Sequence, residues 1–177
     1  MKSLKWLLSV AIVCLFVGAS GTAMAQVVDT CDEGHIWLTA VDEIVVDGKS
    51  CAIVDVLVKG NVTATGGSTI SLHDSQVGGD VTVTGAGNVI IVSNQLLKGV
   101  LRVEGNQTAI VVANNVNRSR GNFTEPGGSS TPGGSILVNN HQEATVKGNI
   151  VGRDLHCEGN GSLQSSSNIV IGNNTCP

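Results

Sequence analysis

The sequence predicts an all-β fold: a single-stranded parallel β-helix (β-solenoid) of about five coils with an N-terminal cap. The main observation is a five-residue signature, in which Ile is followed two positions later by Leu, Val or Ile, and two positions after that by Asn or Asp. It occurs at 70–74, 90–94, 110–114, 136–140 and 169–173. Its last residue recurs at steps of 20, 20, 26 and 33, and such a near-constant step is typical of stacked repeats.

Composition is the second observation. The 177 residues include 23 Gly and no Tyr, and Val, Ile, Thr, Asn and Ser are abundant. Val, Ile and Thr suit pleated strands, while Gly and Asn supply turns with positive φ. No helix-length segment separates the apolar stretches, which excludes a sheet built with helical crossovers.

A second strand precedes each signature, at 60–66, 79–85, 99–105 and 153–159, with a weaker version at 121–125. Apolar and polar residues alternate in it, so Val62, Val81 and Leu101 are expected to face inward. The outward positions then form two columns: Thr63, Thr82, Arg102, Thr124 and His156, and beside them Thr65, Thr84, Glu104 and Glu158. A short third apolar patch, at Val77, Leu96–Leu97, Val116 and Ile150–Val151, completes each coil.

Equivalent residues of successive coils are expected to stack. The signature predicts one inward column of isoleucines: Ile70, Ile90, Ile110, Ile136 and Ile169. It also predicts a coil-corner ladder, because Asn tolerates the left-handed conformation and stacked amides hydrogen-bond to one another. The members of this ladder would be Asp74, Asn94, Asn114, Asn140 and Asn173.

With these features, residues 58–177 resemble the right-handed parallel β-helix family, the architecture of pectate lyases. The resemblance implies right-handed coils and an Asn ladder at one turn. Many members of the family are polysaccharide lyases or hydrolases with acidic residues on the outer face of central coils.

Three segments are expected to lie outside the regular coils. Residues 1–25 are interpreted as a signal peptide, with Lys2 and Lys5 before the apolar run 7–17 and a small-x-small cleavage site at 23–25; an uncleaved membrane anchor is the alternative. Residues 26–57 are interpreted as N-terminal cap strands, with Trp37 packed over the first coil. The Gly/Ser/Pro-rich segment 117–135 should leave the coil as a loop, either a tolerated insertion or a binding loop.

Cleavage after residue 25 would leave 152 residues (177 minus 25), with 8 basic residues (10 minus Lys2 and Lys5) against 14 acidic ones. The resulting charge of −6 argues against a nucleic-acid partner. Beyond the predicted signal peptide, no apolar stretch is long enough to span a membrane.

Four cysteines follow the predicted signal peptide. An even number in an exported chain indicates two disulfides. Of the three possible pairings, Cys31–Cys51 with Cys157–Cys176 is favoured because each pair lies near one end of the chain. Free thiols or a metal site are the alternative, although no Cys-x-x-Cys spacing supports zinc.

Residues suited to catalysis are sparse. Glycoside hydrolysis needs two carboxylates within about 5–10 Å, and Glu104 has only Arg102 as an evident partner, with Glu158 expected two coils away. The acidic residues of 29–47 match no calcium-loop spacing. We therefore predict no catalytic, cofactor-binding or metal-binding residues and no cofactor, and whether the protein is an enzyme stays open.

An outward apolar column is the strongest sign of an interaction. The residue between the two inward positions of the signature is apolar in four coils, which predicts an interaction face made of Ile91, Val111, Leu137 and Val170. Such a stripe is covered either by another molecule or by a segment of the same chain.

These observations favour an exported, non-catalytic β-helix with a structural, adhesive or partner-binding role. It would be secreted, periplasmic or on the cell surface, and its partner would be a protein or cell-surface polymer, with self-association as one form. The alternative is a small carbohydrate-active β-helix enzyme of the polysaccharide lyase or hydrolase kind.

Overall fold

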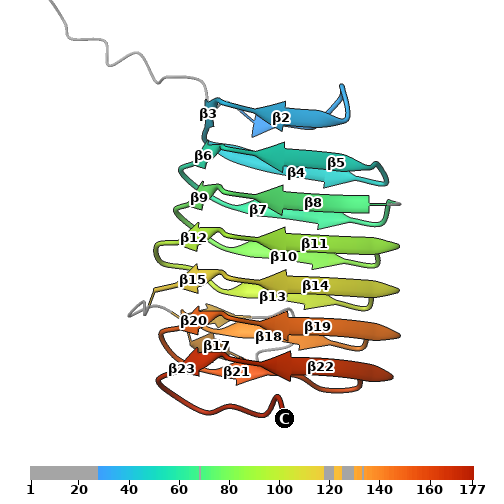
Figure 1. Ribbon diagram of the computed structural model, residues 1–177. Coiled ribbons are helices and arrows are strands. Elements are labelled where there is room, and N and C mark those ends of the chain that lie inside the picture. The colour runs from blue at the N-terminus through green and yellow to red at the C-terminus, as the bar shows by residue number, and fades with distance from the viewer. Residues whose placement is uncertain (1–27, 68, 118–121, 125–129, 133) are drawn as a thin grey trace, which may run out of the picture.

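The computed structural model describes residues 28–177 except 68, 118–121, 125–129 and 133. The predicted signal peptide, residues 1–25, lies outside the described residues. The described chain is an all-β solenoid whose coils stack into three parallel sheets of seven strands each (Figure 1). This confirms the predicted fold class, with seven coils in place of about five.

Each coil contributes one strand to each sheet, in the order A, B, C. Sheet A contains β1 (Val28–Asp29), β4 (Glu43–Asp47), β7 (Val62–Thr65), β10 (Val81–Thr84), β13 (Leu101–Glu104), β18 (Ile136–Asn139) and β21 (Leu155–His156). Sheet B contains β2 (His35–Trp37), β5 (Cys51–Val54), β8 (Thr69–His73), β11 (Asn88–Val92), β14 (Thr108–Val112), β19 (Glu143–Lys147) and β22 (Ser162–Ser166). Sheet C contains β3 (Ala40–Val41), β6 (Leu57–Val58), β9 (Gln76–Val77), β12 (Gln95–Leu96), β15 (Asn115–Val116), β20 (Ile150–Val151) and β23 (Ile169–Val170).

Alternation of side chains along these strands creates the core. In β7, β10 and β13 the first and third residues are buried while the second and fourth are outward, as the sequence pattern predicts. Inward residues of consecutive coils stand in register, for example Val62, Val81 and Leu101. The interior is therefore a narrow, mostly apolar column along the solenoid axis.

The segment expected to be an N-terminal cap is built as ordinary coils. Its strand β4 pairs in parallel with β7, β5 pairs with β8, and β6 pairs with β9, so sheet pairing continues across residue 57 without a change of architecture. Trp37 points outward from β2 with 63% of its surface exposed, while Ile36 is the residue that enters the core. The prediction that Trp37 packs over the first coil is wrong.

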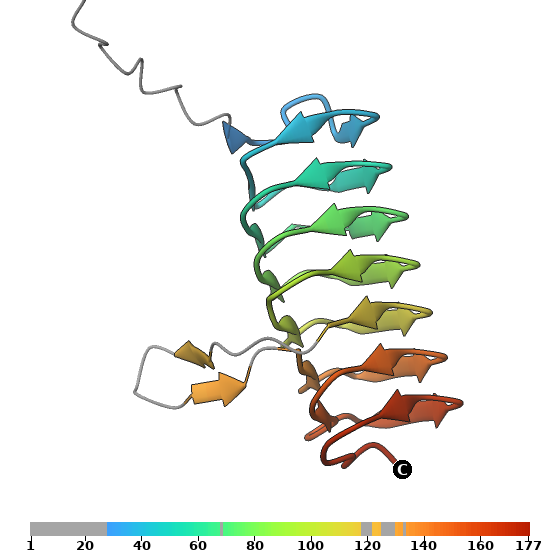
Figure 2. The same ribbon diagram turned by 90° about the vertical axis from the view of Figure 1, so that its left-hand side faces the viewer.

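One insertion interrupts the repeat. Equivalent corner residues are separated by 19, 20, 35 and 19 positions, so a single step is long. The extra residues contain β16 (Asn122–Thr124) and β17 (Ser130–Pro132), which pair antiparallel and project from the side of the solenoid (Figure 2). The segment around Phe123 was expected to be a weak sheet A strand, but Ile136–Asn139 takes that place, and Leu137 instead of Thr124 follows Arg102 in the outward column.

The signature isoleucines do not form one column. Ile90 and Ile110 are paired in sheet B but face outward, whereas Ile136 lies in sheet A and Ile169 in sheet C. The inward residues in register with Ile70 are Val89, Ala109, Ala144 and Leu163. Stacking of equivalent residues is confirmed, but the predicted membership of this column is wrong. The steps of 26 and 33 join motif matches that lie in different sheets, so they are not the lengths of coils.

Two disulfides join neighbouring coils at the two ends of the solenoid, and the predicted pairing is confirmed. Cys31–Cys51 links the first coil to the second, and Cys157–Cys176 holds the C-terminal tail, with Cα–Cα distances of 6.0 and 4.9 Å. Closing a loop of about 20 residues stabilises a fold by about 3 kcal/mol in the chain-entropy model. The disulfides therefore strengthen the coils that have a neighbour on one side only.

A ladder of buried polar side chains runs along the corner between sheets B and C. The Nδ2 group of Asn94 donates to Oδ1 of Asn114 at 3.1 Å, Asn114 donates to Asn149 at 3.1 Å, and Asn149 donates to Asn168 at 3.0 Å. Ser75 occupies the equivalent position in the coil before Asn94. Each Oδ1 also accepts the backbone N–H of the preceding ladder residue, at 2.9–3.0 Å.

Only Asn94 and Asn114 of the five expected ladder residues belong to this ladder. Asp74 lies one position earlier at the same corner, where its φ of 49° meets the need for a left-handed turn. Asn140 lies at the corner between sheets A and B, and Asn173 lies after the last strand of sheet C, near Asp154. The three corners of a coil all favour Asn, Asp or Gly, so composition alone does not distinguish them.

A second ladder occupies the corner between sheets A and B, and its middle member is a histidine. Asn106 accepts the N–H of Ala86, His141 takes the equivalent place beside Asn106, and Asn160 accepts the N–H of His141. His141 is 2% exposed, with Nδ1 at 3.2 Å from the backbone N of Asn106 and Nε2 at 3.0 Å from the carbonyl of Val103. The neutral imidazole fits both contacts, accepting through Nδ1 and donating through Nε2.

Burial lowers the pKa of His141 below the usual 6.5, against smaller opposing effects of its backbone partners and the Glu104 carboxylate. Below pH 6.5 the unfolded chain therefore binds a proton that the folded chain resists, and the free energy of unfolding falls as pH falls. We predict that His141→Asn, which restores the amide found at positions 106 and 160, removes this part of the acid sensitivity. Urea unfolding midpoints at pH 7.5 and 5.0 measure it; equal pH dependence of the two proteins would contradict the prediction.

Candidate interaction surface

The outward face of sheet B is the candidate functional surface. Strand register aligns two columns of outward side chains along all seven coils. The middle column is His35, Ala52, Ser71, Ile90, Ile110, Thr145 and Gln164. The column beside it is Trp37, Val54, His73, Val92, Val112, Lys147 and Ser166, and a third, shorter column contains Thr69, Asn88, Thr108, Glu143 and Ser162.

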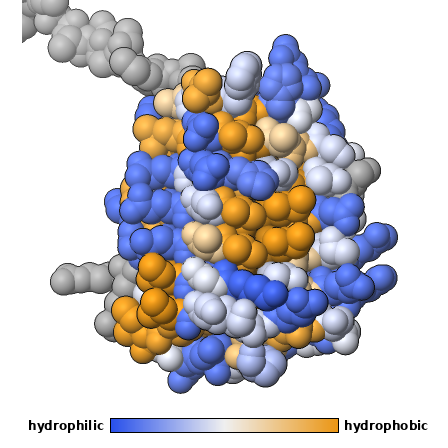
Figure 3. Space-filling model, viewed as in Figure 1, coloured by the Kyte–Doolittle hydropathy of each residue, from blue (hydrophilic) through white to orange (hydrophobic). Residues whose placement is uncertain are grey.

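Two apolar areas lie on this face. The larger consists of Ile90, Val92, Ile110 and Val112 on the paired strands β11 and β14, and it is visible as an orange area over the middle coils in Figure 3. Ile110 is 39% exposed. The smaller area surrounds a shallow hollow of about 400 Å³ on β2 and β5, lined by His35, Ile36, Trp37, Ala52 and Val54.

This surface replaces the interaction face expected from the sequence. Ile91 and Val111 are fully buried, and Val170 also points inward, in register with buried Val151. Leu137 does face outward, but from sheet A. The four residues therefore do not form a stripe, and the exposed apolar side chains of β11 and β14 are those one position away.

The wrong prediction of the interaction face has its cause in the sequence of the strands themselves. Residues 89–92 and 109–112 are apolar on both faces of the strand, so alternation does not indicate which face is buried, and a shift of one residue exchanges the two faces. The glycines at the corner between sheets A and B provide a sequence signal for the buried face of the sheet B strands. Gly66, Gly85 and Gly105 all have positive φ, and the residue four positions after each, Ile70, Val89 and Ala109, is buried.

Charge is nearly absent from the face. Among the outward strand positions that the structure describes on sheet B, only Glu143 and Lys147 carry formal charge, and both lie on β19. The five strands from β2 to β14 present His, Trp, aliphatic, Ser, Thr and Asn side chains. A surface depleted in charge with exposed aliphatic and aromatic groups is characteristic of the core of a protein interface.

The residues considered for catalysis lie on sheet A instead. Arg102 and Glu104 form an ion pair of 3.2 Å between Nη1 and Oε2, and the Arg102 side chain is 12% exposed. Asn139 occupies the next coil in the Glu104 column and accepts the backbone N–H of Glu158, so one coil separates the two glutamates. No second carboxylate therefore stands beside Glu104 on the neighbouring described coils of this column.

The acidic N-terminal region is organised by ion pairs and hydrogen bonds. Asp32 contacts Lys49 at 2.5 Å, and Asp42 contacts Lys59 at 2.8 Å. The Lys49 ammonium lowers the pKa of the exposed Asp32 carboxyl. Asp47 accepts a hydrogen bond from Thr65 at 2.8 Å. Within the described part of the chain, no group of three or more His, Cys, Asp or Glu side chains is arranged to hold a metal ion.

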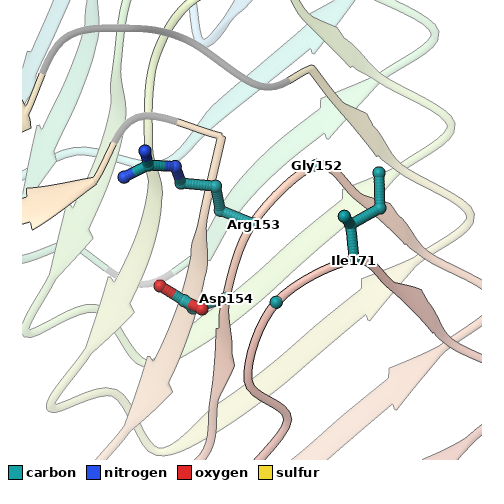
Figure 4. A pocket seen from close by; sticks show the side chains of 5 residues that line it. Gly152, Arg153, Asp154 and Ile171 are labelled. Carbon is teal, nitrogen blue, oxygen red and sulfur yellow. The ribbon is translucent and has the colours of Figure 1, made fainter.

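A hollow of about 270 Å³ lies where the last two coils turn from sheet C to sheet A, lined by Gly152, Arg153, Asp154, Ile171 and Gly172 (Figure 4). The Asp154 carboxylate accepts a hydrogen bond from the backbone N–H of Asn173 at 2.8 Å, so it supports the turn that follows β23. Arg153 and Asp154 extend to one side of the hollow and Ile171 lies on the other. The residues that line the hollow therefore include one cationic side chain, Arg153, and one carboxylate, Asp154, with no second carboxylate.

Comparison with known proteins gives no further identification: no protein-family model, curated protein or solved structure matches the chain. The fold defines the chain as a parallel β-solenoid. Among the described residues, no helix is long and apolar enough to cross a membrane.

Proposed function

We propose that the protein is an exported, non-catalytic parallel β-helix that binds a protein or cell-surface polymer through the outward face of sheet B. The observation that carries this proposal is the uncharged, partly apolar surface that extends over β2, β5, β8, β11 and β14. Its flatness suits contact with another extended surface better than enclosure of a small molecule.

Export is supported by two observations. The structure contains two disulfides, which persist in oxidising compartments, and the first 25 residues have the pattern of a signal peptide. Both observations support a secreted, periplasmic or cell-surface location. The Asn ladder supports the proposed relation to the right-handed, pectate-lyase-like architecture, in which this device stabilises coil turns.

Site-specific photo-crosslinking tests the binding role. A photoreactive amino acid at position 110 lies in the larger apolar area, and the same residue at position 82 lies outward on sheet A as a matched control. In the producing cells, we expect covalent adducts from position 110 and few from position 82. An absence of adducts from position 110, or equal yields from both, would overturn the proposal.

The second candidate function is a carbohydrate-active enzyme, and the ion pair of Arg102 and Glu104 on an outer face is the observation that favours it. Incubation with polygalacturonate and with neutral glucans, followed by measurement of new reducing ends and of unsaturated products, tests this candidate. We expect no products. Product formation that Glu104→Gln abolishes would establish the enzyme and refute the non-catalytic role.

A further inference from the structure

We infer that the outward face of sheet B binds the same face of a second copy of this chain, related by a twofold axis parallel to the solenoid axis. This inference rests on the proposed binding role and names its partner. The inference arises from the distribution of charge on the face. In one particular orientation, this distribution makes the face complementary to the same face of a second copy.

The two charged residues of the face lie at opposite ends of one strand. Glu143 is the first residue of β19 and Lys147 is the last, with Thr145 at the centre. Residues four apart on a strand are separated by about 13 Å, which is too far for an ion pair within one copy. Lys147 instead donates to Gln164 of the next coil at 3.2 Å.

A twofold axis along the middle column reverses strand direction while it keeps equal coils opposite each other. Glu143 of one copy then lies opposite Lys147 of the other, and the symmetric pair repeats the contact. The same operation places Ile90 and Ile110 against their own copies, and Asn88 and Thr108 opposite Val92 and Val112. Each charged side chain of the face then lies opposite one of the other sign. The larger apolar area of one copy packs against the same area of the other copy.

Other twofold arrangements use the face less well. An axis along β8 would place β2 and β5 opposite β14 and β11, which also matches apolar groups. It would, however, leave β19 and β22 outside the contact, with no role for Glu143 and Lys147. The arrangement along the solenoid axis uses all seven strands of the sheet.

The size of the contact predicts a reversible dimer. Seven strands at about 4.8 Å spacing and five residues at about 3.3 Å give a flat area of roughly 550 Å² for each copy. The total of about 1,100 Å² is near the lower limit for specific interfaces. Sheets that pack face to face keep their strand directions within about 30°, and the sheet B strands of Figure 1 stack with little twist.

Sedimentation equilibrium of the disulfide-bonded protein without residues 1–25 tests the inference through a charge-reversal cycle. Glu143→Lys and Lys147→Glu each place like charges opposite one another twice, so each should weaken dimerisation about tenfold. The double variant restores opposite charges and should regain the wild-type dissociation constant. Glu158→Lys, the same charge change near the sheet A edge, is the control and should have no effect.

Every outcome is decisive. A wild-type protein that stays monomeric at millimolar concentration would overturn the inference, as would single variants that dimerise normally or a double variant that is not rescued. Circular dichroism establishes that each variant is folded. If the protein is monomeric but position 110 still gives crosslinked adducts, the proposed binding function stands with a different partner. Failure of the dimer inference can therefore be distinguished from failure of the proposed function.

Discussion

Replacing Ile91 with Ala should cost about 3–4 kcal/mol of unfolding free energy, whereas Ile90→Ala should cost less than about 1 kcal/mol. Ile91 is fully buried, in register with buried Leu72 and Val111, and removal of its side chain leaves a cavity in a core only a few side chains wide. Ile90 is the adjacent residue of the same strand and faces outward. Urea unfolding of both variants measures the difference.

The pair is its own control, because residue type, strand and coil are identical and only the face differs. Equal losses, or a larger loss for Ile90→Ala, would show that β11 has the opposite register. Such a result would also remove the basis for the sheet B surface, since Ile90 and Ile110 would then be core residues.

Loss of the Asn114 amide should have the second largest effect, about 2–4 kcal/mol for Asn114→Ala. Asn114 is 1% exposed, and its Oδ1 accepts the backbone N–H of Asn94 at 3.0 Å while its Nδ2 donates to the carbonyl of Ile91 at 2.9 Å. Alanine leaves both of these buried backbone groups without their side-chain partner, and an unsatisfied buried group costs about 1–3 kcal/mol.

The matched control is Asn115→Ala, at the next residue, which faces outward in β15. Its cost should stay within about 0.5 kcal/mol, as for most surface substitutions. Denaturant titration of both variants with intact disulfides provides the comparison. If the two alanine variants were equally stable, the corner ladder would contribute nothing beyond turn formation.

Much of the coil plan was readable from local patterns. Where apolar and polar residues alternate strictly, as in 62–65 and 81–84, the sequence predicts the correct inward face. The Gly, Ser and Pro residues predict the position of the projecting segment. The disulfide pairing was also correct, because each pair lies near one end of the chain and links neighbouring coils.

The errors have three causes, all of them local ambiguities of the sequence. A motif of Ile, a second aliphatic residue and Asn recurs in all three sheets, so the sequence pattern predicts the wrong strand of the coil for the matches at 136–140 and 169–173. Where a strand is apolar on both faces, as in 109–112, the motif also fixed the wrong face. Asn149, Asn168 and His141 were missed as ladder members because nothing next to them in sequence marks a corner as buried.

Local sequence patterns are therefore enough to predict that this chain winds into stacked parallel coils, since the repeat step and the β-forming composition act within every coil. The packing of the coils against one another is needed to know which side chains are buried, which corner holds the amide ladder, and which face is free to bind. Those choices depend on hydrogen bonds and contacts between residues about 20 positions apart, and a single-residue shift in that pairing exchanges the interior of a strand with its surface.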